Sequence, residues 1–383
     1  MYINGAKSLK IAFKGVKMKI LNLKLLNFRN YEKLELSFNP SKNIIIGQNG
    51  MGKTNIVEAI YVLALTKSFR GSKEEVIIKN NTDLTRIEGT IETKVKNNYK
   101  VIIRNNSKRV KINNTNIDRL TDYLSNINVV LFNSEDLKLI KDTPNTRRKL
   151  ITIELSQFSN DYLKILTYYN KVLKQRNSYL KTLYLNGNAS IDYLNILTDQ
   201  LIELGMKVYN FRQKFIDDIN FYVSKNYKMI AGRDGLVLNY KSDYKGKTKE
   251  DLINLYNKEK DKDIVLGKTN IGIHRDDFDF CLDGYSLKDY GSEGEQKNAI
   301  ISLKMGEIEI FKDKKGDIPI LILDDLFSEL DEEKINNILE FISDDIQTFV
   351  TTTELDKVAD KLKQNSKVFK VFNGTVEEEQ YEK

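Results

Sequence analysis

The octapeptide GQNGMGKT at residues 47–54 constrains the fold of this chain more than any other feature. It matches the phosphate-binding pattern G-x-x-x-x-G-K-[ST], which needs a strand before the loop and a helix after it. The apolar run 43–46 supplies the strand, and residues 53–65 carry apolar side chains at helical spacing. The pattern therefore predicts a strand, a phosphate-binding loop and a helix rather than an incidental glycine turn.

The loop is expected to surround a nucleotide, with ATP and Mg²⁺ as cofactors. Its three glycines would let backbone N–H groups close around the phosphates at the amino end of the helix. Lys53 would reach the β and γ phosphates, and the Thr54 hydroxyl would coordinate Mg²⁺. The expected nucleotide-binding residues are Gly47, Gln48, Asn49, Gly50, Met51, Gly52, Lys53 and Thr54.

A second acidic motif lies far downstream, where the apolar run 320–323 ends in Asp324 and Asp325. Two adjacent carboxylates at the end of a buried strand favour a bound cation, as in a Walker B strand. We expect Asp324 to hold Mg²⁺, mostly through water, and Asp325 to orient or deprotonate the attacking water. An acidic helix cap is the alternative interpretation.

The hexapeptide GSEGEQ at residues 291–296 resembles the signature motif of ABC-type ATPases and begins a predicted helix, 293–311. Ser292 and the backbone of Gly294 would form a second phosphate cradle at the amino end of that helix. In ABC-type ATPases this cradle faces the γ phosphate bound to another subunit, so the resemblance implies a homodimer that forms on ATP binding. Taken alone, the hexapeptide would be a polar helix start.

Six segments of the chain, in order, resemble the RecF family of bacterial recombination and gap-repair ATPases, which is related to the heads of SMC proteins. They are LNFRNYEKLEL, GQNGMGKTNIVEAIYVLALTKSFR, LFNSEDLKLIKDTPNTRRKLI, GIHRDDFDF, GSEGEQK and DDLFSELD followed by TTT. The resemblance covers essentially the whole chain from Met18. It implies ATP-dependent clamping of DNA and, with a RecR-like mediator, loading of recombinase at single-strand gaps and stalled forks, linked to the SOS response. It also adds Arg29 to the nucleotide-binding residues.

Three positions depart from related proteins. Asp325 stands where ABC transporters usually carry Glu, Thr351 begins the TTT string where their switch histidine lies, and Glu295 stands where Gln is common in the RecF family. Because the Asp325 side chain is shorter than Glu, we expect ATP hydrolysis to be slow. We also expect DNA to stimulate it. The residues expected to carry it are Asp325, Lys53 and Ser292.

The apolar spacing predicts an ATPase lobe split by a helical insertion. Residues 18–140 and 233–383 are assigned to the ATPase lobe, and residues 141–232 to the insertion. A heptad seam from Ile151 predicts one long helix that ends at the polar turn 186–190, followed by a second, antiparallel helix. The predicted fold class is α/β, a P-loop ABC/SMC-like ATPase head. Its mixed β-sheet lobe has a parallel core, and its helical second lobe contains an antiparallel helical hairpin.

Four further expectations concern smaller segments. Residues 1–17 are interpreted as an upstream extension, with Met18 as the natural start, and residues 241–263 as a charged linker. The acidic end EEEQYEK, 377–383, is expected to be a frayed, solvated tail. His274 is either part of the string IHRDD or a core histidine with satisfied hydrogen bonds.

Composition excludes some classes of site. The formal charge of +7, from 61 Lys+Arg and 54 Asp+Glu in 383 residues, is compatible with a nucleic-acid partner but does not establish one. One cysteine and one histidine exclude an intramolecular disulfide and a Cys- or His-rich metal site. No apolar run approaches the ~18 residues that span a bilayer, so we expect a soluble, cytoplasmic protein without a membrane partner.

The DNA-binding residues are expected among the basic side chains of the helical insertion. They would meet phosphates if a cleft opens between the helical lobes of a dimer, giving sequence-independent, salt-dependent affinity. The candidates are Arg147, Arg148, Lys149, Lys171 and Lys174. The alternative is a solvated helix face.

Other functions remain open from the sequence. A P-loop enzyme acting on a small-molecule phosphoryl acceptor would leave the signature motif unexplained. An SMC-type head with another role on DNA would share every motif named above. A transporter-type nucleotide subunit is disfavoured by the missing switch histidine and by the helical hairpin.

Overall fold

The computed structural model describes residues 15–71, 74–105, 107–186, 189–355, 358 and 360–381. Of the segment interpreted as an upstream extension, residues 1–14 lie outside the described part. Val16–Lys17 (β1) pairs in parallel with Asp317–Ile318 (β13), and the Lys17 ammonium forms an ion pair with Asp345.

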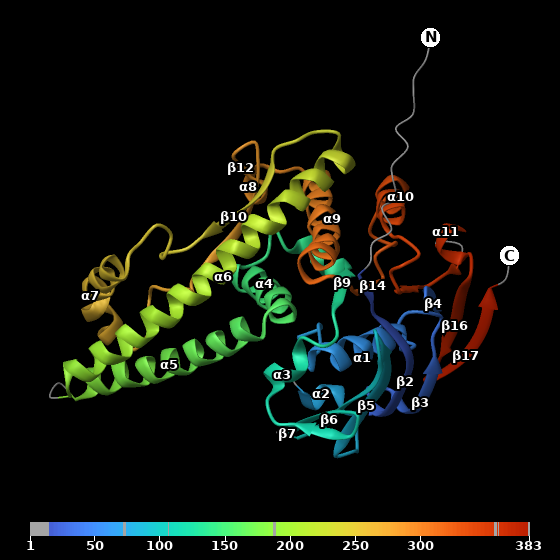
Figure 1. Ribbon diagram of the computed structural model, residues 1–383, viewed down its shortest axis with the longest axis horizontal. Coiled ribbons are helices and arrows are strands. Elements are labelled where there is room, and N and C mark those ends of the chain that lie inside the picture. Colours follow the sequence, from blue (N-terminus) through green and yellow to red (C-terminus); the bar gives the residue numbers. More distant parts are fainter. Residues whose placement is uncertain are drawn as a thin grey trace, which may run out of the picture.

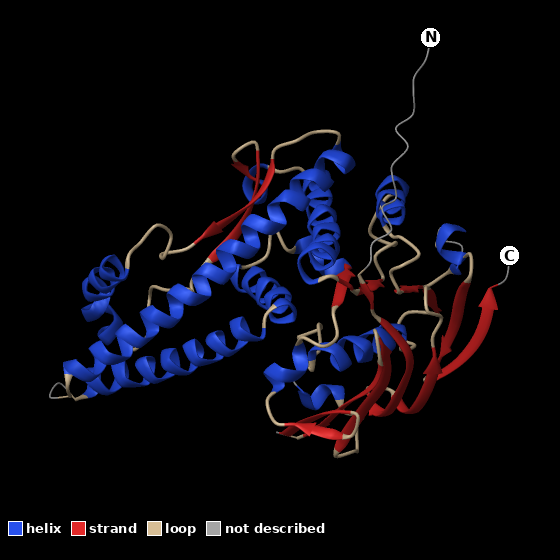
Figure 2. Cartoon of the chain, in the orientation of Figure 1, coloured by secondary structure: helices blue, strands red, loops and turns tan. Residues whose placement is uncertain are grey.

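Strands from both ends of the chain build a mainly parallel sheet in the ATPase lobe (Figures 1 and 2). Its order is β17-β16-β4-β15-β14-β9, and every neighbouring pair except β16 and β17 is parallel. The strands are β4 (Lys42–Ile46), β9 (Val129–Asn133), β14 (Ile320–Asp324), β15 (Thr348–Thr352), β16 (Ser366–Phe372) and β17 (Thr375–Tyr381). The predicted parallel core is confirmed.

The expectation of a frayed acidic tail is wrong for its described residues. Strand β17 pairs antiparallel with β16 along its whole length. Lys367 and Lys370 of β16 form ion pairs with Glu378 and Glu379 of β17, so the acidic side chains have basic partners on the neighbouring strand.

A second sheet of the ATPase lobe is antiparallel throughout, in the order β3-β2-β5-β6-β7-β8. Its strands are β2 (Lys19–Phe28), β3 (Tyr31–Ser37), β5 (Leu84–Glu92), β6 (Lys96–Arg104), β7 (Ser107–Ile112) and β8 (Thr115–Ile117). Alternate side chains of these strands are buried, as the period-2 pattern predicts.

Helix α1 (Lys53–Leu65) lies between the two sheets. The sequence predicts one apolar face, but the helix is buried almost all round, Glu58 and Tyr61 included. A helix covered by sheets on both sides has no solvent face, which explains its near-continuous apolar sequence.

The helical lobe is built from α4 (Pro144–Phe158), α5 (Asn160–Leu185), α6 (Ile191–Ala231) and α7 (Lys249–Leu266). The predicted antiparallel hairpin is α5 and α6, which extends away from the sheets in Figure 1. The prediction of one long helix along the seam from Ile151 to the turn 186–190 is wrong, because Ser159 adopts an extended backbone between α4 and α5. The Ser159 hydroxyl accepts a hydrogen bond from the Tyr162 N–H and so caps α5.

The predicted charged linker contains α7, a correction to the sequence analysis. Thr248 and Asp251 form a capping box at its start, and Leu252 and Tyr256 are buried against the hairpin. Most charged side chains of this helix face solvent, and only a short apolar stripe is buried. The many charged residues therefore led to the prediction of a linker.

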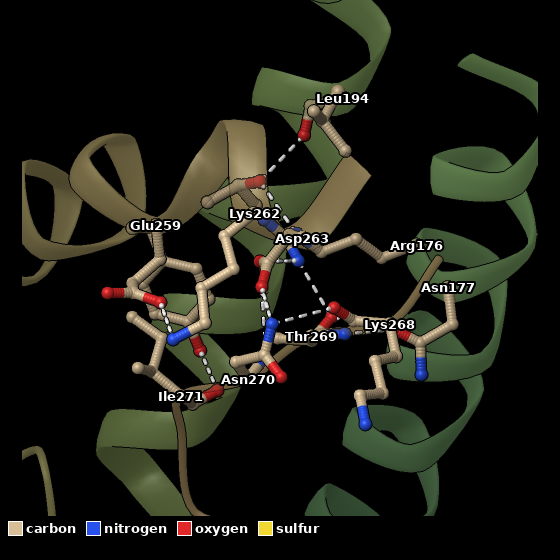
Figure 3. Close-up of polar contacts among 12 residues, drawn as sticks. Arg176, Asn177, Leu194, Glu259, Lys262, Asp263, Lys268, Thr269, Asn270 and Ile271 are labelled. Atoms are coloured by element: carbon tan, nitrogen blue, oxygen red, sulfur yellow. Dashed lines mark hydrogen bonds and ion pairs between the residues drawn. The ribbon is translucent and has the colours of Figure 1, made fainter. Parts of the chain in front are cut away.

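A buried ion pair fixes α7 to the hairpin (Figure 3). The Arg176 guanidinium of α5 donates to the Asp263 carboxylate of α7 at 2.8 Å and to the Thr269 hydroxyl at 2.7 Å. Asn270 donates its backbone N–H and its side-chain amide to the other oxygen of Asp263. Both charged side chains are at most 1% exposed, so each depends on the other for neutralisation.

A small antiparallel sheet packs on α6 after the hairpin. It consists of β10 (Leu236–Lys241), β11 (Asp277–Leu282) and β12 (Tyr285–Ser286), and the inward side chains of β10 join the core of the helical lobe. The segment that follows residue 232 therefore packs with the helical insertion.

The remaining helices connect these parts. They are α2 (Glu74–Ile77), α3 (Leu120–Leu124), a 3₁₀ turn (Ser134–Lys138), α8 (Leu287–Tyr290), α9 (Glu293–Ile310), a π-helical turn (Phe311–Lys315), α10 (Glu332–Phe341) and α11 (Asp360–Lys363). Among the described residues, no helix is both long and apolar enough to cross a membrane.

Candidate nucleotide-binding site

The carboxyl ends of β4, β14 and β15 bring the candidate site together. These three parallel strands are neighbours, so the loop after β4, the acids after β14 and the threonines of β15 meet at one edge of the sheet. Ligands of α/β proteins bind at this edge, because loops and helix amino ends converge there.

The loop 47–54 is closed around the Lys53 ammonium, which donates to the carbonyl oxygens of Gly47 at 2.7 Å and of Gln48 at 3.1 Å. Burial lowers the pKa of Lys53, while the charges of Asp325 and Asp324 oppose that shift. The ammonium therefore lies inside the ring of loop atoms that would surround a phosphate.

Gly52 has a backbone conformation and surroundings that only glycine fits. Its φ is 115°, and a Cβ would lie 2.7 Å from the Asn30 amide and 2.8 Å from the Tyr31 hydroxyl. Tyr31 donates to the Gly52 carbonyl, and Asn30 donates to the Met51 carbonyl. Asn30 of the β2–β3 turn and Tyr31 at the start of β3 therefore support the loop.

The two predicted metal ligands are in direct contact. The Thr54 hydroxyl donates to Asp324 Oδ1 at 3.1 Å, although the residues are 270 positions apart. Thr351 of β15 donates to the same oxygen at 2.7 Å. Burial raises the pKa of Asp324, and the Thr351 and Thr54 hydroxyls oppose this. A buried carboxylate and a hydroxyl on converging elements suit Mg²⁺, which takes one or two protein oxygens and completes its shell with water and phosphate.

Asp325 takes a left-handed backbone, φ 50°, directly after the strand. Its N–H donates to the Thr351 hydroxyl at 2.9 Å, which holds the turn. Asp325 thereby leaves the strand direction and lines the same cavity as Lys53 and Thr54.

The cavity has a volume of about 510 Å³, enough for a nucleotide. Of the predicted nucleotide-site residues it is lined by Arg29, Asn49, Gly50, Gly52, Lys53, Thr54 and Asp325. Gly47, Gln48 and Met51 belong to the loop but do not line the cavity. Their carbonyl oxygens accept hydrogen bonds from Lys53 and Asn30. The sequence analysis missed the lining residues Asn30, Asn55, Arg70, Val76, Ile78 and Asn80.

Arg29 and Arg70 line the same cavity as Lys53 and add positive charge to it. Arg29 also donates twice to the fully buried Glu58 carboxylate of α1, at 2.9 and 2.5 Å, and Arg70 is half exposed beside it. The sequence offered a signal for Arg70, because this residue ends the segment GQNGMGKTNIVEAIYVLALTKSFR that resembles the RecF family.

Ser292 caps the signature helix α9 and lies outside this cavity. Its hydroxyl accepts from the Glu295 N–H, and the Glu295 carboxylate accepts from the Ser292 N–H, which is a capping box. Gly294 is exposed, with no atom within 4 Å of the position of a Cβ. Neither residue is among the described residues that line the cavity of their own chain.

The structure overturns one predicted DNA contact. Arg147 is 4% exposed, bonded twice to the Asp277 carboxylate and further to three backbone carbonyls, so its side chain is structural. Arg148 donates to the Asp276 carbonyl and is half-buried. Lys149, Lys171 and Lys174 are exposed.

His274 is half-buried in the helical lobe and has satisfied hydrogen bonds. Nδ1 lies 2.8 Å from the Tyr169 hydroxyl and Nε2 lies 3.1 Å from the Thr269 carbonyl. Burial lowers the pKa of His274, which keeps the imidazole neutral. Of the two interpretations in the sequence analysis, the structure supports the core histidine.

The parallel sheet, the loop helix beneath it and the separate signature helix define a P-loop head of the ABC/SMC class. Residues 19–377 match the family described as RecF/RecN/SMC N terminal domain. The Smc head domain from Pyrococcus furiosus has a similar fold, with a TM-score of 0.51 at 16% identity over 95% of this chain and 96% of that one.

Comparison with known protein sequences identifies the family of this chain within the ABC/SMC class. The protein named DNA replication and repair protein RecF from Ligilactobacillus salivarius is 38% identical over 371 residues, covering 94% of this chain and 98% of the relative. The protein of the same name from Halalkalibacterium halodurans is 39% identical over 372 residues, covering 94% and 99%. The chain belongs to the RecF family.

A solved structure agrees across the whole fold. The recombination mediator protein RecF-ATP of the RecFOR pathway superposes with a TM-score of 0.88 at 30% identity, over 95% of this chain and 98% of that one.

Proposed function

We propose that this chain is an ATP-dependent, DNA-binding protein of recombinational repair that dimerises on nucleotide. ATP and Mg²⁺ bind between the loop and Asp324 of one subunit, and Ser292 and Gly294 of a second subunit close over the γ phosphate. The observation that carries the proposal is the separation of these two phosphate-binding elements, because Ser292 and Gly294 are absent from the described lining of their own chain's cavity. A second copy completes the site.

The repair role is supported by the relatives. They are named DNA replication and repair protein RecF, and the matching solved structure is a recombination mediator of the RecFOR pathway. The chain accordingly helps to load recombinase at single-strand gaps and stalled forks, together with a RecR-like mediator and in connection with the SOS response. A phosphotransferase acting on a small molecule is not favoured, because the family match extends over residues 19–377.

Hydrolysis is proposed to be slow and stimulated by DNA. Lys53 stabilises charge on the phosphates, and Asp325 orients the attacking water. Thr54 and Asp324 would hold Mg²⁺, which would neutralise further negative charge on the phosphates. The Asp325 carboxylate is one methylene shorter than Glu and is fixed by its turn, so its approach to the water is restricted. A turnover on the order of tens per second without DNA, an ordinary enzyme rate, would contradict this.

The experiment is molecular sizing with ATP and Mg²⁺, with and without duplex DNA. We expect the wild type to shift from monomer to dimer with ATP, and Lys53→Ala and Ser292→Arg to remain monomeric. Ser292→Arg should still bind ATP, because the cavity of its own chain is intact, whereas Lys53→Ala should not. A wild type that binds ATP yet stays monomeric, with unchanged DNA affinity, would exclude the clamp.

A further inference from the structure

We infer that Glu295 and Arg233 are a positioning pair that determines when Ser292 can donate to the nucleotide of a second subunit. The inference rests on the proposed ATP-dependent dimer and adds a step to it. In the free chain Glu295 occupies the donors of Ser292, and Arg233 holds the Glu295 carboxylate once a γ phosphate has displaced it.

The contacts of Ser292 show the competition directly. Its backbone N–H and its hydroxyl both donate to Glu295 Oε2, each at 2.9 Å. These are the two donors that Ser292 can offer to a phosphate oxygen. One carboxylate oxygen therefore occupies the position on Ser292 that a γ-phosphate oxygen would take, and both cannot be there together.

The charge of Glu295 strengthens the competition. Its hydrogen bonds from the Ser292 backbone and side chain lower the pKa of the Glu295 carboxyl, so it is ionised at neutral pH. A phosphate approaching Ser292 meets this fixed negative charge, and like charges in contact oppose binding. The other acid of this helix turn, Glu293, pairs with Lys297 at 3.0 Å, whereas the carboxylate that accepts from Ser292 is that of Glu295.

Arg233 stands where the displaced carboxylate can go. It follows Gly232, the cap of α6, and its Nη1 lies 3.4 Å from Glu295 Oε1 while its Nη2 lies 3.2 Å from Asp283 Oδ2. The contact with Glu295 is therefore already formed on the oxygen that Ser292 does not use. Arg233 follows the carboxyl end of α6, the longer helix of the hairpin. A displacement of that end would therefore change the contact between Arg233 and Glu295.

The test uses variants that keep the helix cap. Glu295→Gln retains the capping box, which accepts either residue, but removes the charge. Glu293→Gln is the matched control, because it removes the same charge from the same helix turn. Arg233→Met removes the positive partner, Arg233→Lys restores the charge, and the double variant Glu295→Gln with Arg233→Met tests whether the two act together. The readout is the ATP concentration that gives half-maximal dimerisation in analytical ultracentrifugation.

We expect Glu295→Gln to dimerise at about tenfold lower ATP, the scale of one removed like-charge contact. Arg233→Met should need several-fold more ATP than the wild type, and Arg233→Lys should recover part of that loss. In the Glu295→Gln background, Arg233→Met should have no further effect. Binding of a fluorescent ATP analogue to the monomer should be the same in all variants, because the loop cavity is untouched.

Two results would overturn the inference while leaving the dimer standing. One is a Glu295→Gln variant that needs as much ATP as the wild type, and the other is a Glu293→Gln variant with an equal gain. A wild type that binds the analogue without dimerising would instead overturn the proposed function, and this inference with it.

Discussion

At the residue scale, Thr351 connects Asp324 and Asp325 although it belongs to neither of the predicted motifs around the nucleotide. Its hydroxyl donates to Asp324 Oδ1 and accepts from the Asp325 N–H, at 2.7 and 2.9 Å. The hydroxyl holds the proposed metal ligand and the proposed water-orienting residue in one geometry.

Thr351→Val tests this role with almost no change of volume. We expect Mg²⁺-dependent ATP affinity to fall about tenfold or more, because a hydrogen bond to a charged group is lost and Asp324 is freed to rotate. Isothermal titration with and without Mg²⁺ measures the effect. Thr352→Val is the control, since the Thr352 hydroxyl donates to the Glu354 carbonyl and does not contact Asp324 or Asp325 in the described part of the chain. Equal affinities of the Thr351 variant and the wild type would contradict the role.

A buried acidic cluster lies where the signature helix meets the ATPase lobe. It consists of Glu154 of α4, Lys304 and Glu307 of α9, and Asp136 of the turn after β9. Burial, helped by neighbouring carboxylates, raises the pKa of Glu154 well above its usual value, and it raises the pKa of Glu307 to about 7 against the opposing charge of Lys304. One oxygen of Glu154 has no hydrogen-bond partner.

The sign of these shifts gives a pH dependence. A carboxyl whose pKa is higher in the folded chain contributes stability below its unfolded pKa, and that stability is lost as the pH rises through the folded value. We therefore expect the free energy of unfolding contributed by this cluster to fall between about pH 5 and 8. Glu154→Gln should flatten this fall and stabilise the protein at pH 8, because it removes a buried carboxyl whose ionisation is opposed by burial. Urea unfolding across this pH range measures it, and a steeper fall in the variant would refute the assignment.

At the element scale, the part of the helical lobe that extends from the sheets consists of three helices, α5, α6 and α7, rather than of a simple hairpin. Helices α5 and α6 form the hairpin, and α7 packs against both of them near its end (Figure 1). Ser159 breaks the heptad seam without ending it, since buried seam residues continue on both sides, from Leu155 to Tyr162. These packed faces and the Arg176–Asp263 pair hold the three helices together.

Breaking that pair should loosen α7. Arg176→Met leaves the Asp263 carboxylate buried without its cation, and we expect a loss of about 3–5 kcal/mol in the free energy of unfolding. The double variant Arg176→Met with Asp263→Asn should lose less. The control is Lys262→Met, which removes an exposed pair with Glu259 in the same view (Figure 3) and should change stability by less than about 1 kcal/mol. Hydrogen exchange localises the effect, and an α7 as protected as in the wild type would contradict the role of the pair.

At the scale of the whole molecule, the two lobes have different proposed functions, nucleotide binding in one and DNA binding in the other. The ATPase lobe carries the loop and the Walker B acids, and the helical lobe presents basic side chains along α5, whose only acidic residue is Asp161. Lys171 and Lys174 lie exposed on that helix, and neither forms an ion pair within the described part of the chain. A surface of this kind suits phosphate contacts in a dimer without sequence readout.

Lys171→Gln with Lys174→Gln should therefore weaken DNA binding and reduce its salt dependence. If both lysines contact phosphates, the slope of log affinity against log salt should become shallower by about two. Fluorescence anisotropy with duplex DNA, ATP and Mg²⁺ measures the slope. Lys258→Gln, a change at an exposed lysine of α7, is the control. An unchanged slope in the double variant would remove α5 from the DNA surface.

The sequence by itself determined the chemistry of the nucleotide site. GQNGMGKT, the acids after 320–323 and the start of the signature helix are local patterns, in which backbone and side-chain roles depend on neighbours a few residues away. The order of these motifs also identified the α/β head, the apolar spacing predicted the helical hairpin, and the predicted helix 53–65 agrees with the bounds of α1.

Only the tertiary structure decided which residues of each type are available. Arg147 and Lys149 are two residues apart in one basic run, yet the first is buried on Asp277 and the second is exposed. Thr351, Arg70 and Arg233 gain their proposed roles from partners that are distant in sequence. Such roles follow from long-range packing and burial, which a pattern of neighbouring residues does not contain.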